Sequence, residues 1–488
     1  MTMTTTPDAA RAVPLVVDLD GTLTPADTLA ESVVHMVRRA PTSLWRLPFW
    51  LLKGRAHLKE AVAARSSLDA EHLPYDEAVV AYLREARAAG RRLVLATAAH
   101  VSIANRVAAF LGLFDGVIAT EGRRNLKGAD KLAAIRATVG GEFAYAGDSR
   151  ADLAVLAHAR AAILVGAPAD VARRVKESMS VEREFPRARP GPADWIRAFR
   201  VHQWAKNVLL FVPLLTSFAF TGLGRLTSCV LAFVAFSLTA SATYVANDLW
   251  DLESDRVHPR KRLRPFASAR IPIASGVGAA SVALAAGLAL AAAVSPAFLL
   301  LMLAYLVLTS LYSWVLKEYV LIDVLMLSLL YTLRIFAGSI AVGIAISSWL
   351  LAFSVFVFLS LALVKRCSEL VTLDRIGKTV TRGRDYRVSD LTVLWPLGVG
   401  AALSAVVVFG LFVAAPETQA RYATPELLGL VGVGLLYWLA RLWIKTSRQE
   451  MHDDPVVYAL RDRGSRLVLL AMTAVVLAAH FLDLGRIR

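Results

Sequence analysis

Residues 226–255 read LTSCVLAFVAFSLTASATYVANDLWDLESD, and this stretch decides the fold class of the second part of the chain. Its first 21 residues, 226–246, are predominantly apolar and long enough to cross a bilayer as a helix. Asp248, Asp251 and Asp255 follow at once, spaced three and four residues apart, so they share one face of a helix. Like charges at the end of a membrane span repel one another and are costly to desolvate, which indicates a functional site.

The composition predicts a soluble domain joined to a membrane domain. The chain has 488 residues, of which 56% are hydrophobic, and its mean hydropathy of +0.53 is too high for an ordinary soluble protein. Residues 1–195 carry mixed charges and no long apolar run, whereas apolar stretches recur after about residue 207. RARPGPADW, residues 187–195, is typical of a linker. We therefore expect one domain at 1–190 and a second at 195–488.

The apolar stretches and the charges between them predict a membrane topology. Lys and Arg gather in three loops, 249–271, 365–390 and 445–465, which the positive-inside rule places in the cytoplasm. Such loops explain most of the net charge of +15 without nucleic acid. The start of the chain has no signal-peptide pattern, so we expect an inner or plasma membrane protein with a cytoplasmic N-terminal domain and an external C-terminus. We expect nine spans, at about 208–222, 226–246, 272–294, 296–316, 319–342, 347–364, 391–414, 426–444 and 466–484.

The aspartates after the second span have two interpretations. One is a solvated helix end whose carboxylates pair with nearby Arg and Lys side chains. The interpretation that we favour is a site for Mg²⁺, a hard cation that prefers oxygen ligands and leaves positions open for a phosphorylated substrate. The basic run HPRKRLRP, residues 258–265, follows directly. Carboxylates beside Arg and Lys suit a diphosphate leaving group.

NDLWDLESD, residues 247–255, resembles the first Asp-rich motif of the UbiA superfamily of intramembrane prenyltransferases, and the resemblance covers about residues 195–488. Where this superfamily has a second motif of spaced aspartates, the chain reads LVKRCSELVTLD, residues 363–374, with Glu369 and Asp374 in their place. This departure disfavours ordinary aromatic prenylation. HQWAKNVLLFVPL, LVKRCSEL and DPVVYALRDR are closer to the polyprenyl-phosphate phosphoribosyltransferases, although Ala269 stands where glycine is common.

This resemblance implies that 5-phosphoribose is transferred from phosphoribosyl pyrophosphate to a polyprenyl phosphate, which gives a precursor of cell-wall arabinan. Asp248, Asp251 and Asp255 would hold Mg²⁺ and be catalytic. For any single basic residue, a role in topology or in binding lipid headgroups remains equally open. Arg334 lies in the middle of a span, where an unpaired charge is costly, so we expect it to face the cleft. The residues expected to bind substrate are Asn247, Lys206, Lys261, Arg262, Arg264, Tyr312, Lys317, Arg334, Lys365, Arg366 and Glu369.

The first 190 residues contain acidic side chains after apolar strands. AVPLVVDLDGTLTPADT, residues 12–28, places Asp18 and Asp20 directly after a buried strand, and EFAYAGDSRAD, residues 142–152, does the same for Asp148 and Asp152. Such acids mark the carboxyl edge of a parallel α/β sheet, where sites of this fold class lie. RRLVLATAAH ends a further strand near Thr97, and NLKGADKL supplies lysines.

These four motifs resemble those of the haloacid dehalogenase-like (HAD) phosphatases, over residues 13 to about 185. The resemblance implies that Asp18 is the nucleophile and that Asp20 is the general acid and base. It also implies that Thr97 binds the phosphoryl group and that Lys127, with Lys131 as the alternative, neutralises it. Mg²⁺ would be held by Asp18, by Asp20 through its carbonyl and by Asp148, with Asp152 in support. A catalytically inactive domain used as a scaffold is the other interpretation.

Residues 25–90, between the first two motifs, read as helical, and in HAD enzymes this position carries a small cap. The cap includes SLWRLPFWLLKG, residues 43–54, which is aromatic and apolar with basic neighbours. Such a stretch can contact a membrane surface or form the core of the cap, and the sequence does not decide between them.

Together the motifs predict a bifunctional enzyme that binds a bilayer, polyprenyl phosphate, phosphoribosyl pyrophosphate and Mg²⁺, and they leave both a monomer and an oligomer open. The HAD domain would remove the 5-phosphate that the transferase leaves on its product. Two alternatives stay open. The helical part could instead transfer a polyprenyl group from a diphosphate to an aromatic acceptor, and the HAD domain could regulate or dock without turnover.

Overall fold

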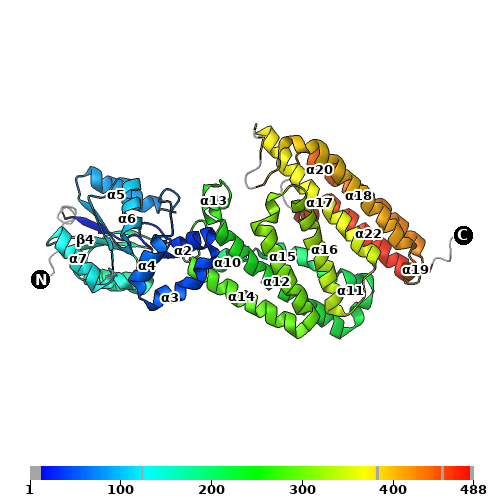
Figure 1. Cartoon of the computed structure of the whole chain (residues 1–488), viewed down its shortest axis with the longest axis horizontal. Helices are drawn as coiled ribbons and strands as arrows, with labels where there is room; N and C mark the ends of the chain where they lie inside the picture. Colours follow the sequence, from blue (N-terminus) through cyan, green and yellow to red (C-terminus); the bar gives the residue numbers. More distant parts are fainter. Residues whose placement is uncertain (1–12, 123–124, 378, 381–383, 452–454, 484–488) are drawn as a thin grey trace. The chain divides into compact units, whose positions relative to one another are not determined.

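The computed structural model describes residues 13–122, 125–377, 379–380, 384–451 and 455–483 (Figure 1). It divides into two compact units, which are treated separately below. The first unit comprises Met1–Phe199 and Tyr244–Ala280, and the second comprises Arg200–Thr243 and Ser281–Arg488. Lys378 and Arg382 of the basic loop 365–390, and the C-terminal residues 484–488, lie outside the described residues.

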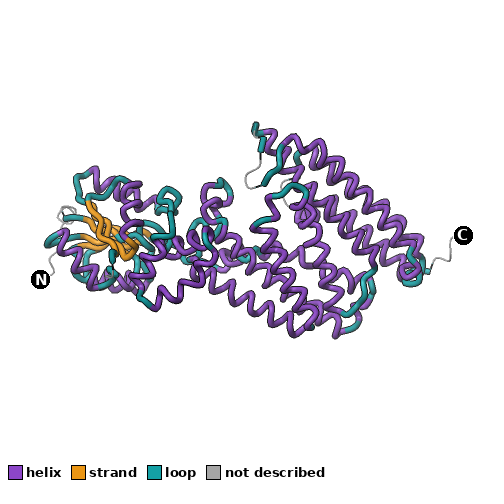
Figure 2. Tube along the Cα trace, in the orientation of Figure 1, coloured by secondary structure: helices purple, strands orange, loops and turns teal. Residues whose placement is uncertain are grey.

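The first unit is built around a parallel sheet of six strands, in the order β3-β2-β1-β4-β5-β6 (Figure 2). The strands are apolar and buried because helices cover both faces of the sheet. Leu15 and Val17 of β1 point into one apolar core, and Val16 points into the other. The strands are β1 Leu15–Val17, β2 Leu93–His100, β3 Gly116–Thr120, β4 Ala144–Gly147, β5 Ala161–Val165 and β6 Val181–Phe185.

The helices of this domain divide into a covering layer and a cap. The covering layer includes α5 Glu77–Ala88, whose Val79, Val80 and Leu83 are buried in the sheet core, so α5 belongs to the core and not to the cap. The remaining members of this layer are α6 Val101–Leu111, α7 Ala129–Val139, η2 Arg150–Asp152, α8 Leu153–Leu156 and α9 Ala169–Ser178. The cap consists of α2 Thr28–Arg39, the 3₁₀ helix η1 Pro41–Arg46, α3 Leu47–Leu52 and α4 Arg55–Ala63.

The first unit also contains the segment that joins two membrane-length helices. The end of α12 Leu223–Trp250 continues into α13 Leu252–Val257, η5 Lys261–Leu263 and the start of α14 Ile273–Val294. A short helix after the linker, α10 Pro192–Ala198, packs on this segment. Val245, Leu249 and Phe266 form the shared apolar core with Ala198.

The second unit is helical and has the composition of a multi-pass membrane domain. Within the described residues, eight helical segments of the chain are long and apolar enough to cross a bilayer. They are Leu223–Trp250, Ile273–Val294, Pro296–Trp314, Ile322–Val342, Ser348–Arg375, Val388–Ala414, Pro425–Ser447 and Arg463–Phe481. The long helices in these segments are α12, α14, α15 Pro296–Trp314, α16 Ile322–Val342, α17 Ser348–Arg375, α18 Leu391–Ala414, α20 Leu428–Ser447 and α22 Arg463–Phe481. The shorter helices of this part of the chain are η6 Leu316–Glu318, η7 Val388–Asp390, α19 Pro416–Gln419, η8 Pro425–Leu427 and α21 Pro455–Arg461.

The expected first span, 208–222, is not one membrane-length helix. The chain forms three short helices here: the 3₁₀ helix η3 Val201–Phe211, the five-residue α-helix α11 Val212–Thr216 and the 3₁₀ helix η4 Ala219–Thr221. Phe218 adopts φ 51°, a left-handed conformation that interrupts a right-handed helix. The nine expected spans are therefore eight membrane-length helices and one broken segment.

Candidate active sites

The first candidate site lies where neighbouring strands of the sheet end. Strands β1 and β4 are hydrogen-bonded neighbours, so Asp18 after β1 and Asp148 after β4 emerge at the same carboxyl edge. Asp152 joins them from η2, one turn after β4. Each of the three carboxylates places an oxygen within 4.8 Å of the others, the spacing of a shared cation site.

A glycine makes this close approach possible. Gly21 has φ +79°, and a Cβ atom built on it would lie 2.1 Å from Oδ2 of Asp148. Any side chain here would therefore displace Asp148 from the cluster. The same turn is held by Arg187, whose Nη1 donates to the carbonyl oxygen of Gly21 at 2.7 Å. The sequence reasoning did not single out Arg187, which lies far along the chain in the linker region.

Lys131 is the lysine that contacts the nucleophile candidate. Its Nζ lies 2.9 Å from Oδ2 of Asp18 and 3.5 Å from Oδ1 of Asp152, and it donates to the Tyr145 hydroxyl at 2.6 Å. Tyr145 donates in turn to Asp152 at 2.7 Å. Lys131 and Asp152 are both buried. This network orients Asp18 and supplies one positive charge to a group of three carboxylates.

Burial and mutual repulsion raise the pKa of two of the clustered acids, Asp18 and Asp148. Burial is the main cause that raises the pKa of Asp18 to about 6, and the nearby Lys131 opposes it. Burial also raises the pKa of Asp148 to about 7, with further contributions from Asp152 and Asp18. A divalent cation among these oxygens would favour the ionised forms, so the donor set fits Mg²⁺.

Asp20 has the environment of a general acid. Its Oδ1 accepts a hydrogen bond from the backbone N–H of Thr28, at the first turn of α2, at 2.9 Å. Burial, and after it the charge of Asp27, raise the pKa of Asp20 to about 7. A carboxyl with that pKa can both donate and accept a proton near neutral pH.

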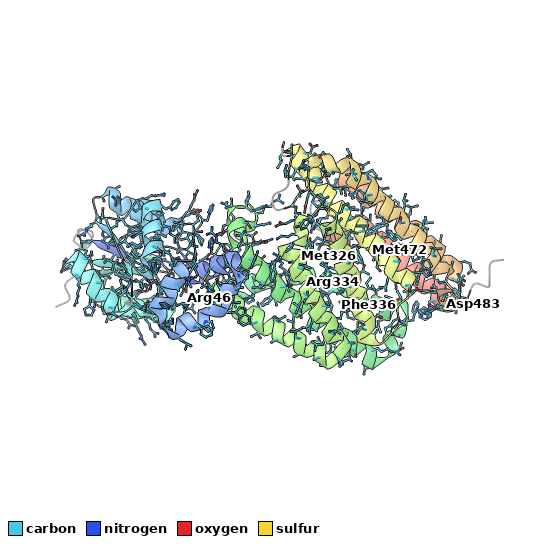
Figure 3. The ribbon with its side chains drawn as sticks, in the orientation of Figure 1. Arg46, Met326, Arg334, Phe336, Met472 and Asp483 are labelled. Carbon is cyan, nitrogen blue, oxygen red and sulfur yellow. The ribbon has the colours of Figure 1, made fainter. Side chains whose placement is uncertain are left out.

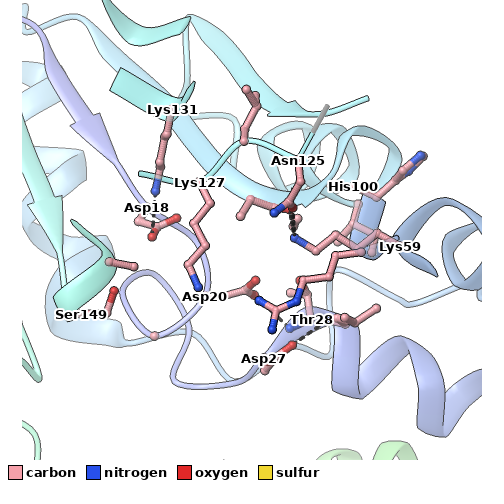
Figure 4. Close-up of a pocket in the computed structure, with 18 of the residues that line it drawn as sticks. Asp18, Asp20, Asp27, Thr28, Lys59, His100, Asn125, Lys127, Lys131 and Ser149 are labelled. Atoms are coloured by element: carbon pink, nitrogen blue, oxygen red, sulfur yellow. Dashed lines mark hydrogen bonds and ion pairs between the residues drawn. The ribbon is translucent and has the colours of Figure 1, made fainter. Parts of the chain in front are cut away.

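These acids line a cavity of about 560 Å³ between the sheet edge and the cap (Figure 4). Lys127 lines it too, and Figure 4 shows both Lys127 and Lys131 directed toward the aspartates. Thr97 is buried and its hydroxyl accepts the Ala99 N–H at 3.0 Å, and it is not among the residues that line the cavity. The sequence analysis assigned no role to five further cavity residues, Arg55, Lys59, His100, Asn125 and Ser149. Arg55 and Lys59 come from the cap, and the other three lie within the quoted motif stretches at positions for which the motifs imply no role.

The second candidate site, also in the first unit, contains the Asp-rich motif. Asp248, in the last turn of α12, and Asp255, in α13, are buried and share one partner. Nη1 of Arg264 lies 3.1 Å from Oδ1 of Asp248 and 2.5 Å from Oδ2 of Asp255. Oδ1 of Asp255 accepts no hydrogen bond among the described residues, although Nζ of Lys261 lies 3.8 Å away. A buried carboxylate oxygen without a donor suits a cation, so this motif also fits Mg²⁺.

The remaining predicted residues of this motif are more open to solvent. Asn247 and Asp251 are half-buried, and Lys261 and Arg262 are exposed. In the described residues, Asp248, Asp251 and Asp255 do not bring three carboxylate oxygens as close together as the HAD cluster does. Ala269 adopts φ 51°, a left-handed conformation that glycine would adopt without strain, so the turn forms with a strained alanine.

In the second unit, Arg334 is buried in the middle of α16 and has partners (Figure 3). Its Nε donates to Oδ1 of Asn207 at 3.0 Å, and its guanidinium stacks near the rings of Phe236, Tyr305 and Tyr331. Nζ of Lys206 lies 5.5 Å from the centre of the Tyr331 ring. The attraction between a cation and the face of an aromatic ring helps to stabilise the charges of Arg334 and Lys206 within an apolar helix bundle.

A glycine allows the segments that carry Arg334 and Asn207 to approach each other closely. Gly338 in α16 faces the backbone of η3, and a Cβ atom there would lie 2.0 Å from the carbonyl oxygen of Leu210. The close approach of η3 to α16 places Asn207 beside Arg334, one turn away from Gly338. The Nδ2 group of Asn207 also donates a hydrogen bond to Oγ of Ser237, at 3.0 Å.

A second buried charge group in this unit joins α16 and α17. Arg366 pairs with Asp323 and with Glu369, and Tyr312 donates to Oδ1 of Asp323 at 2.8 Å. Asp323 is fully buried, and the sequence reasoning missed it. An acid at the start of an apolar span was the signal that could have found it. Lys317 and Lys365 are half-buried, and Asp374 is exposed.

Comparisons with known proteins match two families to different parts of the chain. The UbiA prenyltransferase family matches residues 209–461, and the haloacid dehalogenase-like hydrolase family matches residues 15–157. A solved UbiA homolog from Archaeoglobus fulgidus, bound to GPP and Mg²⁺, has a TM-score of 0.46 and 16% identity over 59% of this chain and all of that one.

Two relatives in sequence differ in how much of the chain they cover. An uncharacterized protein of Sinorhizobium fredii is 40% identical over 96% of this chain and 91% of its own length. Decaprenyl-phosphate phosphoribosyltransferase of Mycobacterium tuberculosis is 31% identical over 58% of this chain and 93% of its own length. The chain is thus a multi-pass membrane protein of the UbiA prenyltransferase family with an HAD-like domain at its N-terminal end.

Proposed function

We propose that the chain is a bifunctional membrane enzyme of polyprenyl-phosphate metabolism. Residues 195–488 transfer 5-phosphoribose from phosphoribosyl pyrophosphate to a polyprenyl phosphate, and residues 1–190 remove the 5-phosphate from that product. One observation carries the proposal: a phosphatase-like aspartate cluster is fused to a helical part that is similar to a decaprenyl-phosphate phosphoribosyltransferase. The product of such a transferase still carries a phosphomonoester, which is the bond that a HAD phosphatase hydrolyses. The product would be a precursor of cell-wall arabinan.

In the phosphatase, an oxygen of Asp18 attacks the phosphorus of the 5-phosphate, and the bond from phosphorus to the ribose oxygen breaks. Asp20 donates the proton that this oxygen needs, and then accepts a proton from the water that hydrolyses the aspartyl-phosphate. Lys131 holds Asp18 in place and neutralises charge on the phosphoryl group, while Lys127 contacts the substrate from the cavity wall. Mg²⁺ held by Asp18, the carbonyl of Asp20 and Asp148 would lower the charge of the phosphoryl group.

In the transferase, the bond between the anomeric carbon and pyrophosphate breaks, and an oxygen of the lipid phosphate bonds to that carbon. Asp248, Asp251 and Asp255 would hold the Mg²⁺ that stabilises the leaving pyrophosphate. Arg264, which lies between two of these carboxylates, is placed to contact a phosphate oxygen beside the metal. Lys261 and Arg262 are exposed next to it and suit the 5-phosphate or the lipid phosphate.

The proposal includes the topology that the charged loops predict. The phosphatase and the Asp-rich segment lie in the cytoplasm, where phosphoribosyl pyrophosphate is available, and the C-terminus lies outside. The broken segment 201–221 then crosses the membrane as the first of nine passes.

The test uses the full chain in nanodiscs with polyprenyl phosphate and radiolabelled phosphoribosyl pyrophosphate. The parent should yield a lipid that carries ribose without its 5-phosphate. Asp18→Asn should accumulate the 5-phosphorylated lipid, since it removes the nucleophile only. Asp248→Ala should give no lipid product, yet it should dephosphorylate phosphoribosyl lipid that is supplied. Asp69→Asn, an exposed carboxylate of the same domain, is the matched control and should behave as the parent.

Mass spectrometry of the extracted lipids separates the possible outcomes. If Asp18→Asn and the parent give the same dephosphorylated lipid, the HAD domain does not act on this product. If the parent labels no lipid from phosphoribosyl pyrophosphate but joins a polyprenyl diphosphate to an aromatic acid, the transferase assignment is wrong.

A further inference from the structure

The cap of the HAD domain exposes a dense group of large apolar side chains. Leu44, Trp45, Phe49, Leu51 and Leu52, called here the aromatic patch, lie in η1 and α3, and Trp45 and Leu52 are 78% and 85% exposed. No residue of α3 is buried. This decides the question that the sequence left open: the stretch is not the core of the cap. Contiguous exposed apolar side chains of this kind mark a surface that another phase or molecule covers.

The charges around the patch favour an anionic lipid surface as its partner. Arg46 lies within the patch segment (Figure 3), and Lys53 follows it directly; both are exposed. From residue 38 to residue 59 the sequence contains six Arg and Lys residues and no Asp or Glu. Exposed Trp and Phe with flanking cations are the composition of segments that lie in the headgroup region of a bilayer.

The patch begins beside a segment that must lie near the membrane. Helix α2 ends at Arg39 and η1 begins at Pro41. One residue before that end, Nη1 of Arg38 lies 3.1 Å from Oε2 of Glu253, in the segment that connects the candidate spans α12 and α14. Both candidate spans end where this connection, residues 251–272, begins and ends, so it is tied to one bilayer surface at both of its ends. The patch therefore starts within a few residues of a contact with that surface segment.

The patch also continues into the phosphatase cavity. Leu51 belongs to the patch and lines the cavity that contains Asp18 and Asp20. Arg55 and Lys59, from the following helix α4, line the cavity as well. Lys59 is oriented by bonds from its Nζ to the carbonyl oxygen of Ala98 at 2.6 Å and to Oδ1 of Asn125 at 2.7 Å. An apolar chain can thus pass over Leu51 while anionic groups enter toward the cations.

We propose that the η1–α3 segment is an interfacial element: the aromatic patch inserts into the headgroup region of an anionic bilayer and holds the mouth of the phosphatase cavity at the membrane surface. The site then takes lipid-linked phosphomonoesters directly from the bilayer. The identity of the lipid-linked substrate rests on the function proposed above, whereas the insertion of the patch does not.

The insertion is tested on the full chain in nanodiscs that contain an anionic phospholipid. Nitroxide labels are attached singly at Trp45→Cys, Phe49→Cys and Phe110→Cys, with the buried Cys229 and Cys367 replaced by alanine. Phe110 is the matched control, since it is 49% exposed on α6 of the same domain and outside the patch. The labels at positions 45 and 49 should be relaxed more by oxygen than by a water-soluble nickel chelate, and the label at 110 should show the reverse. Patch labels that resemble the control, or that neither reagent reaches because protein covers them, would overturn the proposal.

The consequence for catalysis is tested with the double variant Trp45→Ser/Leu52→Ser, which removes two exposed side chains that do not line the cavity. Its kcat/KM for a phosphoribosyl polyprenyl phosphate in nanodiscs should fall by about tenfold or more, because productive binding needs the bilayer contact. Its kcat/KM for p-nitrophenyl phosphate in solution should stay within about twofold of the parent. The control Phe110→Ser should change neither value.

Equal losses on both substrates, or no loss on the lipid, would contradict the interfacial role. If the parent hydrolyses p-nitrophenyl phosphate but not the phosphoribosyl lipid, the proposed function fails, and the nitroxide measurement still decides whether the patch inserts.

Discussion

At the scale of single residues, the structure separates two lysines that the motif left as alternatives. Lys131 is buried and contacts Asp18, Tyr145 and Asp152, so its charge acts directly on the carboxylate of Asp18, the proposed nucleophile. Lys127 lines the same cavity without an ion pair to Asp18 among the described contacts. We therefore propose that Lys131 holds Asp18, the proposed nucleophile, and that Lys127 acts on the substrate side.

Substitution of each lysine by glutamine should have a different kinetic effect. Lys131→Gln should lower kcat for phosphate release by about a hundredfold, as expected when a preorganised positive group at the reacting centre is lost. Lys127→Gln should raise KM and lower kcat by less than about tenfold. Steady-state phosphate release from p-nitrophenyl phosphate measures both, and retained transferase activity shows that each variant is folded. A larger loss of kcat in Lys127→Gln would reverse the two roles.

At the scale of elements, α2 connects the phosphatase site with the Asp-rich segment. Its first turn donates the Thr28 N–H to Asp20. One turn later, Glu31 makes two hydrogen bonds with Arg256 of α13, at 2.5 and 3.0 Å, and both side chains are almost fully buried. A buried and bidentate pair has little tolerance for the loss of one partner, because the other charge then stays desolvated.

Removal of one partner should destabilise the first unit strongly. Glu31→Ala should lower its free energy of unfolding by about 3–5 kcal/mol, whereas the exposed pair of Arg38 with Glu253 should contribute less than about 1 kcal/mol. Arg38→Ala is therefore the matched control. Thermal unfolding of the full chain in nanodiscs, with denaturant titration of the first unit, measures the difference.

The double variant Glu31→Met/Arg256→Met should recover most of the loss, since two apolar side chains leave no buried charge. Equal stability of Glu31→Ala and Arg38→Ala would show that the pair does not hold these elements together.

At the scale of the whole molecule, the broken segment after the linker decides how many passes the proposed topology contains. The HAD-like domain and the segment that follows α12 belong to one compact unit and are joined by the Glu31–Arg256 pair, so we expect both on the same side of the membrane. If α12 crosses the bilayer once, as we propose, it begins on the opposite side, and we then expect residues 200–222 to cross before it. The 11 residues of η3 and the five of α11 extend about 30 Å at about 2.0 and 1.5 Å per residue, which matches the hydrocarbon thickness.

Labelling with a membrane-impermeant maleimide tests this crossing. In a background without Cys229 and Cys367, Gly222→Cys should react from outside intact cells, and Ser254→Cys should react only after permeabilisation. Both positions are exposed. If Gly222→Cys also needs permeabilisation, the segment does not cross, and the count of passes falls to eight.

The sequence by itself determined the fold classes and the chemical types of both candidate sites. Acids that directly follow apolar strands lie at the carboxyl edge of a parallel sheet, and the resemblance to the HAD motifs paired Asp18 with Asp148 there. Runs of about 20 apolar residues must be helical in a bilayer, because every backbone N–H and C=O needs a partner within the helix. Both signals are local or periodic, and they do not depend on distant contacts.

Only the tertiary structure decided which charged groups meet. Asp323 with Arg366, Asn207 with Arg334 and Glu31 with Arg256 are each separated by 43 to 225 residues. No local pattern specifies such a pair, because its energy comes from the desolvation of two groups that the fold brings together. The same reason explains why the sequence could not assign SLWRLPFWLLKG to core or surface. An apolar run indicates that burial of its side chains is favourable, but only the tertiary packing decides whether other parts of the same chain bury them.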